Sequence, residues 1–330
     1  MFNYVKSQLR DPAQTHYLVD SDFRTVAQGW ARADGTGPLD LWAHRNPGYV
    51  FRTGEYTSDT LAWNAARDEM VDFRGDVLFL TAGAYSIGTA TTWDVPYARI
   101  TGSEAPAPFY GCSPRVRKSS ITGAVATTGS ILLGADADGL EVSYLRFIPT
   151  SAAPIFTVNA VAQNMHFHNF LYDAVGIATD AGTEFMDVIT TADGIEFAVF
   201  EHFTMLADSA IGPLLNIDVA QHFVTLKNFS INASETVGTW ATALIDYSAD
   251  GVDGITICDG EVFVSLAGAG AISELITGAA QTGTSVIQIS KVYGSIGLTA
   301  LAGGTAGDAD LCNNYIATTE GGTGGTLYTT

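Results

Sequence analysis

Two histidines and two glutamates in this sequence could together bind a metal ion. His166 and His168 are two residues apart in "MHFHNF", so in an extended strand both side chains point to the same side. Glu141 and Glu196 take the matching outward position in the neighbouring copies of a repeated motif. Imidazole and carboxylate groups are donors that divalent metals accept. The alternative is a ladder of surface charges. We favour it because nothing in the spacing closes a tetrahedron, and we expect neither a metal nor another cofactor.

Three aspartates form a second group that could do chemistry. Asp187, Asp218 and Asp246 lie near the ends of predicted strands in three successive repeats, and we place Asn159 in the same column. Carboxylates on neighbouring strands could act as the general acid and base of a glycoside hydrolase. An Asp that closes a strand before a turn is also ordinary turn chemistry, which is the explanation we favour. We therefore predict no catalytic site, and these aspartates are the candidates only if the protein is a hydrolase.

The repeat that positions these residues has the pattern φ-x-φ-x-x-φ-x-φ, where φ is an apolar residue. Leu140, Val142, Leu145 and Phe147 follow it, and further copies start at positions 165, 195, 224, 255, 287 and 309, which are 22 to 32 residues apart. A second apolar stretch, such as "PIFTVNA" or "EFMDVI", precedes each copy. Polar turns such as "DADG" and "TADG" join the two, because Asp and Gly tolerate positive φ. Each repeat therefore holds two short strands.

Strands this short cannot bury a face alone, but they can when they are stacked as coils. Every coil then pairs with the coils above and below it at a spacing of about 4.8 Å. Antiparallel hairpins would show tighter turns, and a leucine-rich solenoid would show helical stretches. We therefore predict an all-β protein, a single-stranded right-handed parallel β-helix of about nine coils.

The inward positions of the repeat should form columns through the core. The copy that starts at position 195 contains Ile195, Phe197, Phe200 and Phe203. In this register Phe170, Phe200 and Phe229 fall in one inward column and should stack. The aromatic residues are therefore assigned to the core, which leaves few of them for a platform on which sugars could stack.

A short helix is predicted at the start of the coils. Residues 60–73, "TLAWNAARDEMVDF", have a helical period, with Leu61, Ala65, Met70 and Phe73 roughly on one side. Ser58 or Asp59 would be its N-cap. The helix, within 57–73, would cap the open end of the first coil, which otherwise presents bare apolar edges.

The capping helix, a strand that ends in "LTAGAY" and a later "ITG" resemble the first coils of right-handed β-helices of the pectate-lyase type. Tailspikes and other virion proteins of tailed phages share this fold. The resemblance covers roughly 57–316. It is specific for the fold but weak for activity, because the scaffold hosts lyases, hydrolases and binding proteins alike. Lyases of this type use Arg and Lys to hold an acidic sugar, and after residue 150 the chain has two Lys and no Arg. A lyase is therefore disfavoured.

The charges of the chain are unevenly distributed along its 330 residues, which carry a net charge of −20. Thirteen of the fifteen Lys and Arg residues precede residue 150, and nineteen acidic residues follow it. So acidic a half would repel nucleic acid and anionic lipid, and we expect neither nucleic acid nor a membrane as a partner. The start "MFNYVKSQLR" lacks the apolar core of a secretory signal. With three cysteines, the chain fits synthesis in a reducing cytoplasm.

The first 56 residues differ from the repeats and are predicted to form an attachment arm. They contain a flexible joint, "ADGTGP", and large aromatic residues that so short a segment cannot bury by itself. Such residues dominate the energy of protein interfaces. The candidate partner-binding residues are Trp30, Trp42, Tyr49 and Phe51. At the other end, 317–330 is expected to be a Gly-rich tail.

Together with the resemblance, these features predict a non-enzymatic structural protein of a tailed-phage virion, made in the cytoplasm of the bacterial host. It would be a capsid decoration or a neck or tail appendage, a homotrimer that docks through its arm onto a major capsid, neck or tail protein. The alternative is a tailspike depolymerase, a glycoside hydrolase that acts on a host surface glycan. A bacterial surface adhesin is a weaker third alternative.

Overall fold

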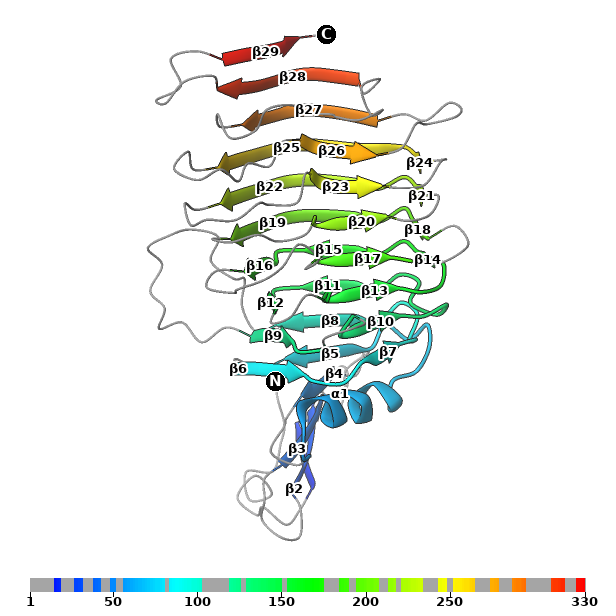
Figure 1. Cartoon of the computed structure of the whole chain (residues 1–330). Helices are drawn as coiled ribbons and strands as arrows, with labels where there is room; N and C mark the ends of the chain where they lie inside the picture. Colours follow the sequence, from blue (N-terminus) through cyan, green and yellow to red (C-terminus); the bar gives the residue numbers. More distant parts are fainter. Residues whose placement is uncertain are drawn as a thin grey trace.

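The computed structural model describes the greater part of the chain. The described residues are 15–18, 27–31, 38–42, 48–51, 56–80, 83–102, 119–125, 129–149, 153–174, 184–189, 194–207, 213–217, 221–233, 243–247, 252–264, 274–278, 287–294, 310–317 and 325–329. They form a right-handed parallel β-helix, in which three sheets run along the axis of a stack of coils (Figure 1). The predicted fold class is confirmed.

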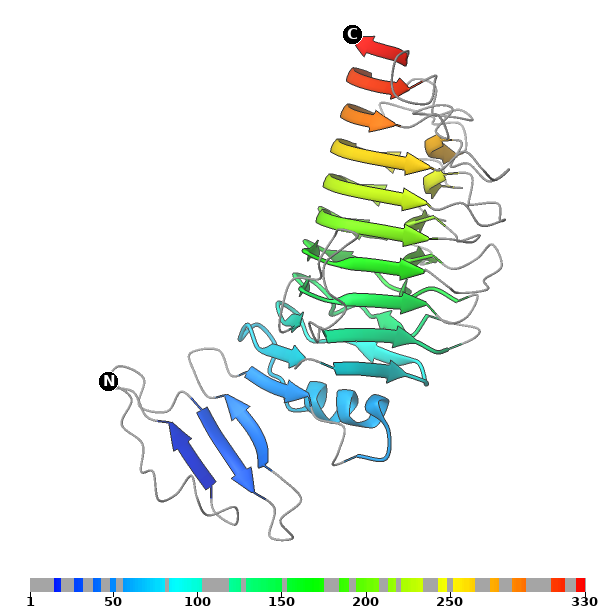
Figure 2. The same cartoon turned by 90° about the vertical axis from the view of Figure 1, so that its left-hand side faces the viewer.

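The first sheet contains one strand from each coil, and its strands pair in parallel from β5 to β28. In chain order they are β5 (Val77–Leu80), β8 (Arg99–Gly102), β11 (Glu141–Ser143), β15 (His166–His168), β19 (Val199–Ala207), β22 (Thr225–Ala233), β25 (Ile255–Val264), β27 (Ile287–Gly294) and β28 (Asp310–Ala317). Figure 2 shows the strands of this sheet stacked in the order of the sequence. These nine strands agree with the expected number of coils.

A corner divides the first sheet into two halves. In the early coils separate strands form the second half, and from β19 onward one long strand covers both halves. The separate strands are β6 (Gly83–Ile87), β9 (Ser119–Gly123), β12 (Arg146–Pro149) and β16 (Leu171–Ala174).

Two further sheets close the coils. The second sheet consists of β7 (Thr91–Trp93), β10 (Ile131–Leu133), β13 (Phe156–Val158), β17 (Met186–Val188), β20 (Leu215–Ile217), β23 (Ala243–Tyr247) and β26 (Glu274–Gly278). The third sheet consists of β14 (Ala162–Gln163), β18 (Ile195–Glu196), β21 (Gln221–His222) and β24 (Val252–Asp253), which lie one above another along one edge of the molecule (Figure 1).

Single residues with positive φ turn the chain at two corners of each coil. The corner column between the third and first sheets has φ values from 54° to 72° and contains Tyr97, Gly139, Asn164, Phe197, Phe223 and Gly254. The column between the two halves of the first sheet has φ values from 51° to 58° and contains Tyr144, Asn169, His202, Asn228, Asp259 and Lys291. A left-handed residue reverses the local twist within one position, so the strands on both sides of the corner keep their parallel partners.

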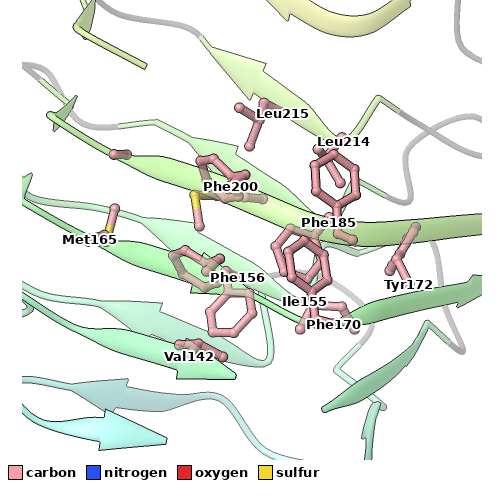
Figure 3. Packing of buried hydrophobic residues seen from close by; sticks show 14 of the residues in the cluster. Val142, Ile155, Phe156, Met165, Phe170, Tyr172, Phe185, Phe200, Leu214 and Leu215 are labelled. Atoms are coloured by element: carbon pink, nitrogen blue, oxygen red, sulfur yellow. The ribbon is translucent and has the colours of Figure 1, made fainter. Parts of the chain in front are cut away.

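Phenylalanine rings stack in columns through the core. The ring centroids of Phe170 and Phe203 are 5.1 Å apart, and those of Phe203 and Phe229 are 5.4 Å apart. Phe200 stacks instead on Phe167, at 5.1 Å, in the neighbouring column. All five rings are buried, as Figure 3 illustrates for Phe170 and Phe200. The predicted burial of the column is confirmed, but Phe203 and not Phe200 lies between Phe170 and Phe229.

This difference arises because the copy assigned to Ile195 is three residues out of register. Strand pairing matches Phe167 with Phe200, so the copy begins at Ala198. Ile195 belongs to the third sheet, and Phe197 lies at the corner with half of its surface exposed. Ile195 and Phe197 have the same apolar spacing as the first two positions of the repeat. The apolar pattern alone does not show how long the turn before the strand is.

Helix α1 (Asp59–Asp68) begins at the predicted N-cap, because the Ser58 hydroxyl accepts a hydrogen bond from the Leu61 amide at 3.2 Å. It ends earlier than the expected Phe73. Of the residues expected on one side, Met70 is buried, whereas Leu61 and Phe73 are exposed; Trp63, which was not in that set, is buried. The Trp63 ring meets the edge of Trp93 at 5.7 Å, so α1 covers this end of the coil stack (Figure 1).

The strands before α1 connect directly to the coils. β1 (Thr15–Leu18), β2 (Ala27–Ala31), β3 (Pro38–Trp42) and β4 (Gly48–Phe51) form an antiparallel series. β4 then pairs in parallel with β5, the first strand of the first sheet. At the other end, β29 (Gly325–Thr329) pairs with β28 in the antiparallel direction. No helix in the described ranges is long and apolar enough to cross a membrane.

The column of stacked rings ends on a glycine, which yields a test of the register. A Cβ at Gly260 would lie 2.2 Å from Cζ of Phe229. We expect Gly260→Ala to reduce the free energy of unfolding by about 1–3 kcal/mol through overpacking. Phe229→Leu in the same chain should recover part of that loss. Gly88→Ala is the control, because a Cβ there would meet nothing within 4 Å. Equal melting temperatures for the two alanine variants would contradict the register.

Candidate functional site

The outward face of the first sheet carries a ladder of charged side chains, and Glu141 forms its lower part. Its Oε1 lies 3.2 Å from Nε2 of His168, on the next coil. Its Oε2 lies 3.0 Å from Nε of Arg99, on the previous coil. The hydrogen bond with His168, together with the charge of Arg99, holds the pKa of Glu141 below its ordinary value, although burial acts in the opposite direction.

Glu201 forms the upper part of this ladder. Its Oε2 accepts a hydrogen bond from Nζ of Lys227 at 2.8 Å, and its Oε1 lies 2.7 Å from Nε2 of His166. The bond with Lys227, followed by that with His166, lowers the pKa of Glu201. The Glu201 side chain is 16% exposed and that of Lys227 is 38% exposed, so the cation lies outside its partner.

These contacts are those of a surface charge ladder. The rings of His166 and His168 lie 4.4 Å apart, and each faces a glutamate on a different neighbouring coil. The two carboxylates are therefore held apart on opposite sides of the histidine pair. Within the part of the chain that the structure describes, no group of three or more His, Cys, Asp or Glu side chains could hold a metal ion.

Glu196 does not belong to this ladder, contrary to the sequence-based expectation. It lies on β18 in the third sheet, level with Gln163 and His222, and its Oε2 accepts a hydrogen bond from Gln163 Nε2 at 2.6 Å. Val199 takes the position expected for it beside His166. The cause is again the register error of three residues. That error also hid Glu201, which has the correct spacing once the copy begins at Ala198.

The aspartates of the second sheet are arranged differently from the predicted column. Asp187 is level with Asn216, and Asn216 with Asp246, so an amide separates the two carboxylates. Nδ2 of Asn216 donates a hydrogen bond to Asp187 at 3.0 Å. Asn159 is not in this column, because Thr157 is the residue level with Asp187. Asp218 lies outside the described residues.

The candidate partner-binding residues lie on the strands that precede α1. Trp30 is on β2 and Trp42 on β3, while Tyr49 and Phe51 are on β4, opposite Leu78 and Leu80 of β5. Their side chains lie outside the described part of the structure, so their role in docking stays a prediction.

Sequence reasoning missed several aromatic residues at the surface. Tyr97, Phe197 and Phe223 lie in the corner column between the third and first sheets, and each is about half exposed. Assigning all aromatic residues to the core was therefore wrong. One signal could have revealed them: each lies two residues before a strand of the first sheet, where other coils have Gly139 or Gly254.

The ladder predicts that acid destabilises the fold. Because the folded pKa of Glu201 lies below the ordinary 4.5, its contribution to stability is present above that pH and is lost as the pH falls through the lowered value. We expect Glu201→Gln to reduce the free energy of unfolding by about 1 kcal/mol at neutral pH, and by less in acid. Thermal melts at several pH values measure this. Glu261→Gln, on the other half of the sheet, is the control, and an equal loss in both variants would argue against the ladder.

No protein-family model and no curated protein matches the chain. Among solved structures it is similar to Geobacillus virus E2 ORF18, with 10% identity and a TM-score of 0.35 over 81% of this chain and 61% of that one. It is also similar to the Agl-KA catalytic domain, with 14% identity and a TM-score of 0.42 over 77% of this chain and 48% of that one. A third similar structure is tailspike protein gp49 of Acinetobacter baumannii bacteriophage Fri1, a capsular polysaccharide depolymerase. It has 10% identity and a TM-score of 0.36 over 96% of this chain and 71% of that one. The chain thus spans 61% and 48% of the first two, and the description of its fold rests on its own strand pairing.

Proposed function

We propose that this protein is a non-enzymatic structural component of a tailed-phage virion, a capsid decoration or a neck or tail appendage. The observation that carries the proposal is the continuity between the arm and the coils. β4, the last strand of the arm, pairs with β5 along its whole length, from Gly48 opposite Val77 to Phe51 opposite Leu80. An arm joined in this way holds the β-helix in a fixed direction, because the two share one hydrogen-bonded sheet. The arm docks onto a capsid, neck or tail protein, and the coils project outward as a homotrimer.

The state of the carboxylates supports a role without catalysis. The acid of a glycoside hydrolase must be protonated, whereas the contacts with histidines and cations that lower the pKa of Glu141 and Glu201 favour the ionised form of both groups. Asp187 and Asp246 are two strand spacings apart, about 9–10 Å. Asn216, a neutral amide that donates a hydrogen bond to Asp187, occupies the strand between them.

One observation favours the alternative, a tailspike depolymerase that hydrolyses a host surface glycan. Asp187 and Asp246 share a column on the outward side of the second sheet, and Asp218 follows the strand between them in the sequence. Carboxylates from neighbouring coils would then supply the acid and the base.

The two functions differ in their response to the loss of these carboxylates. We expect Asp187→Asn, Asp218→Asn and Asp246→Asn to leave infectivity and particle attachment unchanged, because none of the three acts on a substrate. The measurement is plaque formation, together with an assay for reducing sugars released from host surface glycan. Sugar release by the wild type that any of these variants abolishes would establish the depolymerase instead.

The continuity of β4 with β5 also determines how the arm should be tested. Deletion of residues 1–46 keeps β4, so we expect a soluble, folded β-helix that no longer attaches to the particle. Deletion of residues 1–52 removes β4 and uncovers the edge of β5, so this variant should melt at a lower temperature. In the full chain, Trp30→Ala and Trp42→Ala should weaken attachment. Circular dichroism and the occupancy on purified particles measure these effects, and full occupancy after the shorter deletion would place the docking surface on the coils.

A further inference from the structure

An aromatic ridge runs along the corner between the third and first sheets. We define it as Phe73, Tyr97, Phe197 and Phe223, whose exposed fractions are 73%, 48%, 50% and 52%. The rings form two pairs, Phe73 with Tyr97 and Phe197 with Phe223, and Gly139 and Asn164 lie between the pairs in the same corner column. The corner follows the stacked strands β14, β18, β21 and β24 along one edge of the molecule (Figure 1). Apolar surface repeated in this way along one edge is typical of an interaction site.

The turn itself does not require these rings. Tyr97, Phe197 and Phe223 have φ values of 57°, 54° and 58°, a region that bulky residues rarely adopt. The same column contains Gly139 and Asn164, residue types that favour this conformation. Strained residues at exposed positions persist where they serve a function. The ridge is therefore a feature added to a corner that forms without it.

Several of the ring faces lie against neighbours along the ridge. Phe197 and Phe223 stack at 5.0 Å with an interplanar angle of 10°. The other face of Phe223 lies over Gly254, where an added Cβ would approach the ring to 2.7 Å. Tyr97 lies in the same way over Gly139, at 2.5 Å. Stacking with a sugar requires a free ring face, so the faces of Tyr97 and Phe223 that lie over glycines are closed to a sugar, and the exposed remainder of the rings suits packing against a protein surface.

The two flanks of the ridge differ in the charge that lies outermost. On the first sheet Arg99 is 54% exposed and its partner Glu141 28%, so the cation lies outside. Lys227 stands outside Glu201 in the same way. On the third sheet, Asp138 and Glu196 come directly before the corner residues Gly139 and Phe197; both are partly exposed and accept hydrogen bonds from Gln163, with no cation among these contacts. The first-sheet flank of one copy therefore complements the third-sheet flank of another.

We propose that the aromatic ridge is the surface on which copies of this chain associate side by side around a common axis. Contacts between two different flanks are heterologous, and such contacts form a closed ring when the rotation from one copy to the next is a whole fraction of a turn, as in a trimer. Four aromatic side chains that are about half exposed supply roughly 400 Å² of apolar surface. A stable interface buries about 800 Å² on each partner, and the charged flanks along the ridge supply the remainder. The inference rests on the proposed function, for which it names the contact surface of the homotrimer.

The test uses the full-length chain and the double substitution Phe197→Asn with Phe223→Asn. Asn is the residue of the same corner column at Asn164, so the variant should fold. We expect the wild type to sediment as a trimer and the variant as a monomer, with a dissociation constant raised at least about 100-fold. The matched control is Phe263→Asn with Tyr293→Asn, at rings that are 55% and 56% exposed outside the ridge, which should remain trimeric.

A second variant tests the flanks without changing the ridge. Glu196→Lys should weaken association, whereas Glu261→Lys should not. A wild type that is monomeric, or a ridge variant that remains trimeric, would overturn the inference. The inference would also be overturned if the wild type were monomeric and substitution of the ridge abolished its attachment to the particle. The ridge would then be the contact surface for another virion protein. Because association is measured without particles, a trimer that fails to attach contradicts the proposed function and leaves the ridge assignment intact.

Discussion

Parallel pairing of each coil with the next is the constraint on which the rest of this structure depends. It brings equivalent residues to about 4.8 Å from one another, so each position of the repeat becomes a column. A ring in the core must then accept a ring or a small residue above it, and Gly260 fills that role over Phe229. Stacking identical charges at this distance is unfavourable, which explains why Glu141 and Glu201 contact histidines and cations on other coils.

The apolar pattern predicts the fold well because burial decides it. The nine coils, the Ser58 N-cap and most of the outward column that contains Glu141 and His166 follow from it. The pattern fails where the length of a turn changes, since a residue at a corner has no burial signature. Ile195 and Phe197 imitate the first two positions of a copy, and only pairing with the neighbouring coils shows that the copy begins at Ala198.

The prediction of the candidate sites depended on the register more than the prediction of the fold did. A shift of three residues leaves a strand a strand, but it exchanges Glu196 for Val199 beside His166 and brings Glu201 into the ladder. In the second sheet the register puts Asn216, a neutral amide, between Asp187 and Asp246. Residue types alone indicate which chemistry is conceivable, whereas the column indicates which groups meet. The exposed rings at the corner escaped prediction for a related reason: an aromatic residue does not itself indicate positive φ, and only its position relative to the glycines of other coils does.

The scarcity of cations limits the orientations in which two copies of the chain can approach each other. After residue 150 the sequence has two lysines, and the structure pairs both of them: Lys227 with Glu201 at 2.8 Å and Lys291 with Asp259 at 3.4 Å. Two copies of so acidic a chain repel one another over most orientations. The repulsion is weakest where the outermost groups are basic on one flank and acidic on the other, which is the corner that carries the aromatic ridge. The surplus of acid thus disfavours other contacts between copies, and the few exposed cations favour one corner.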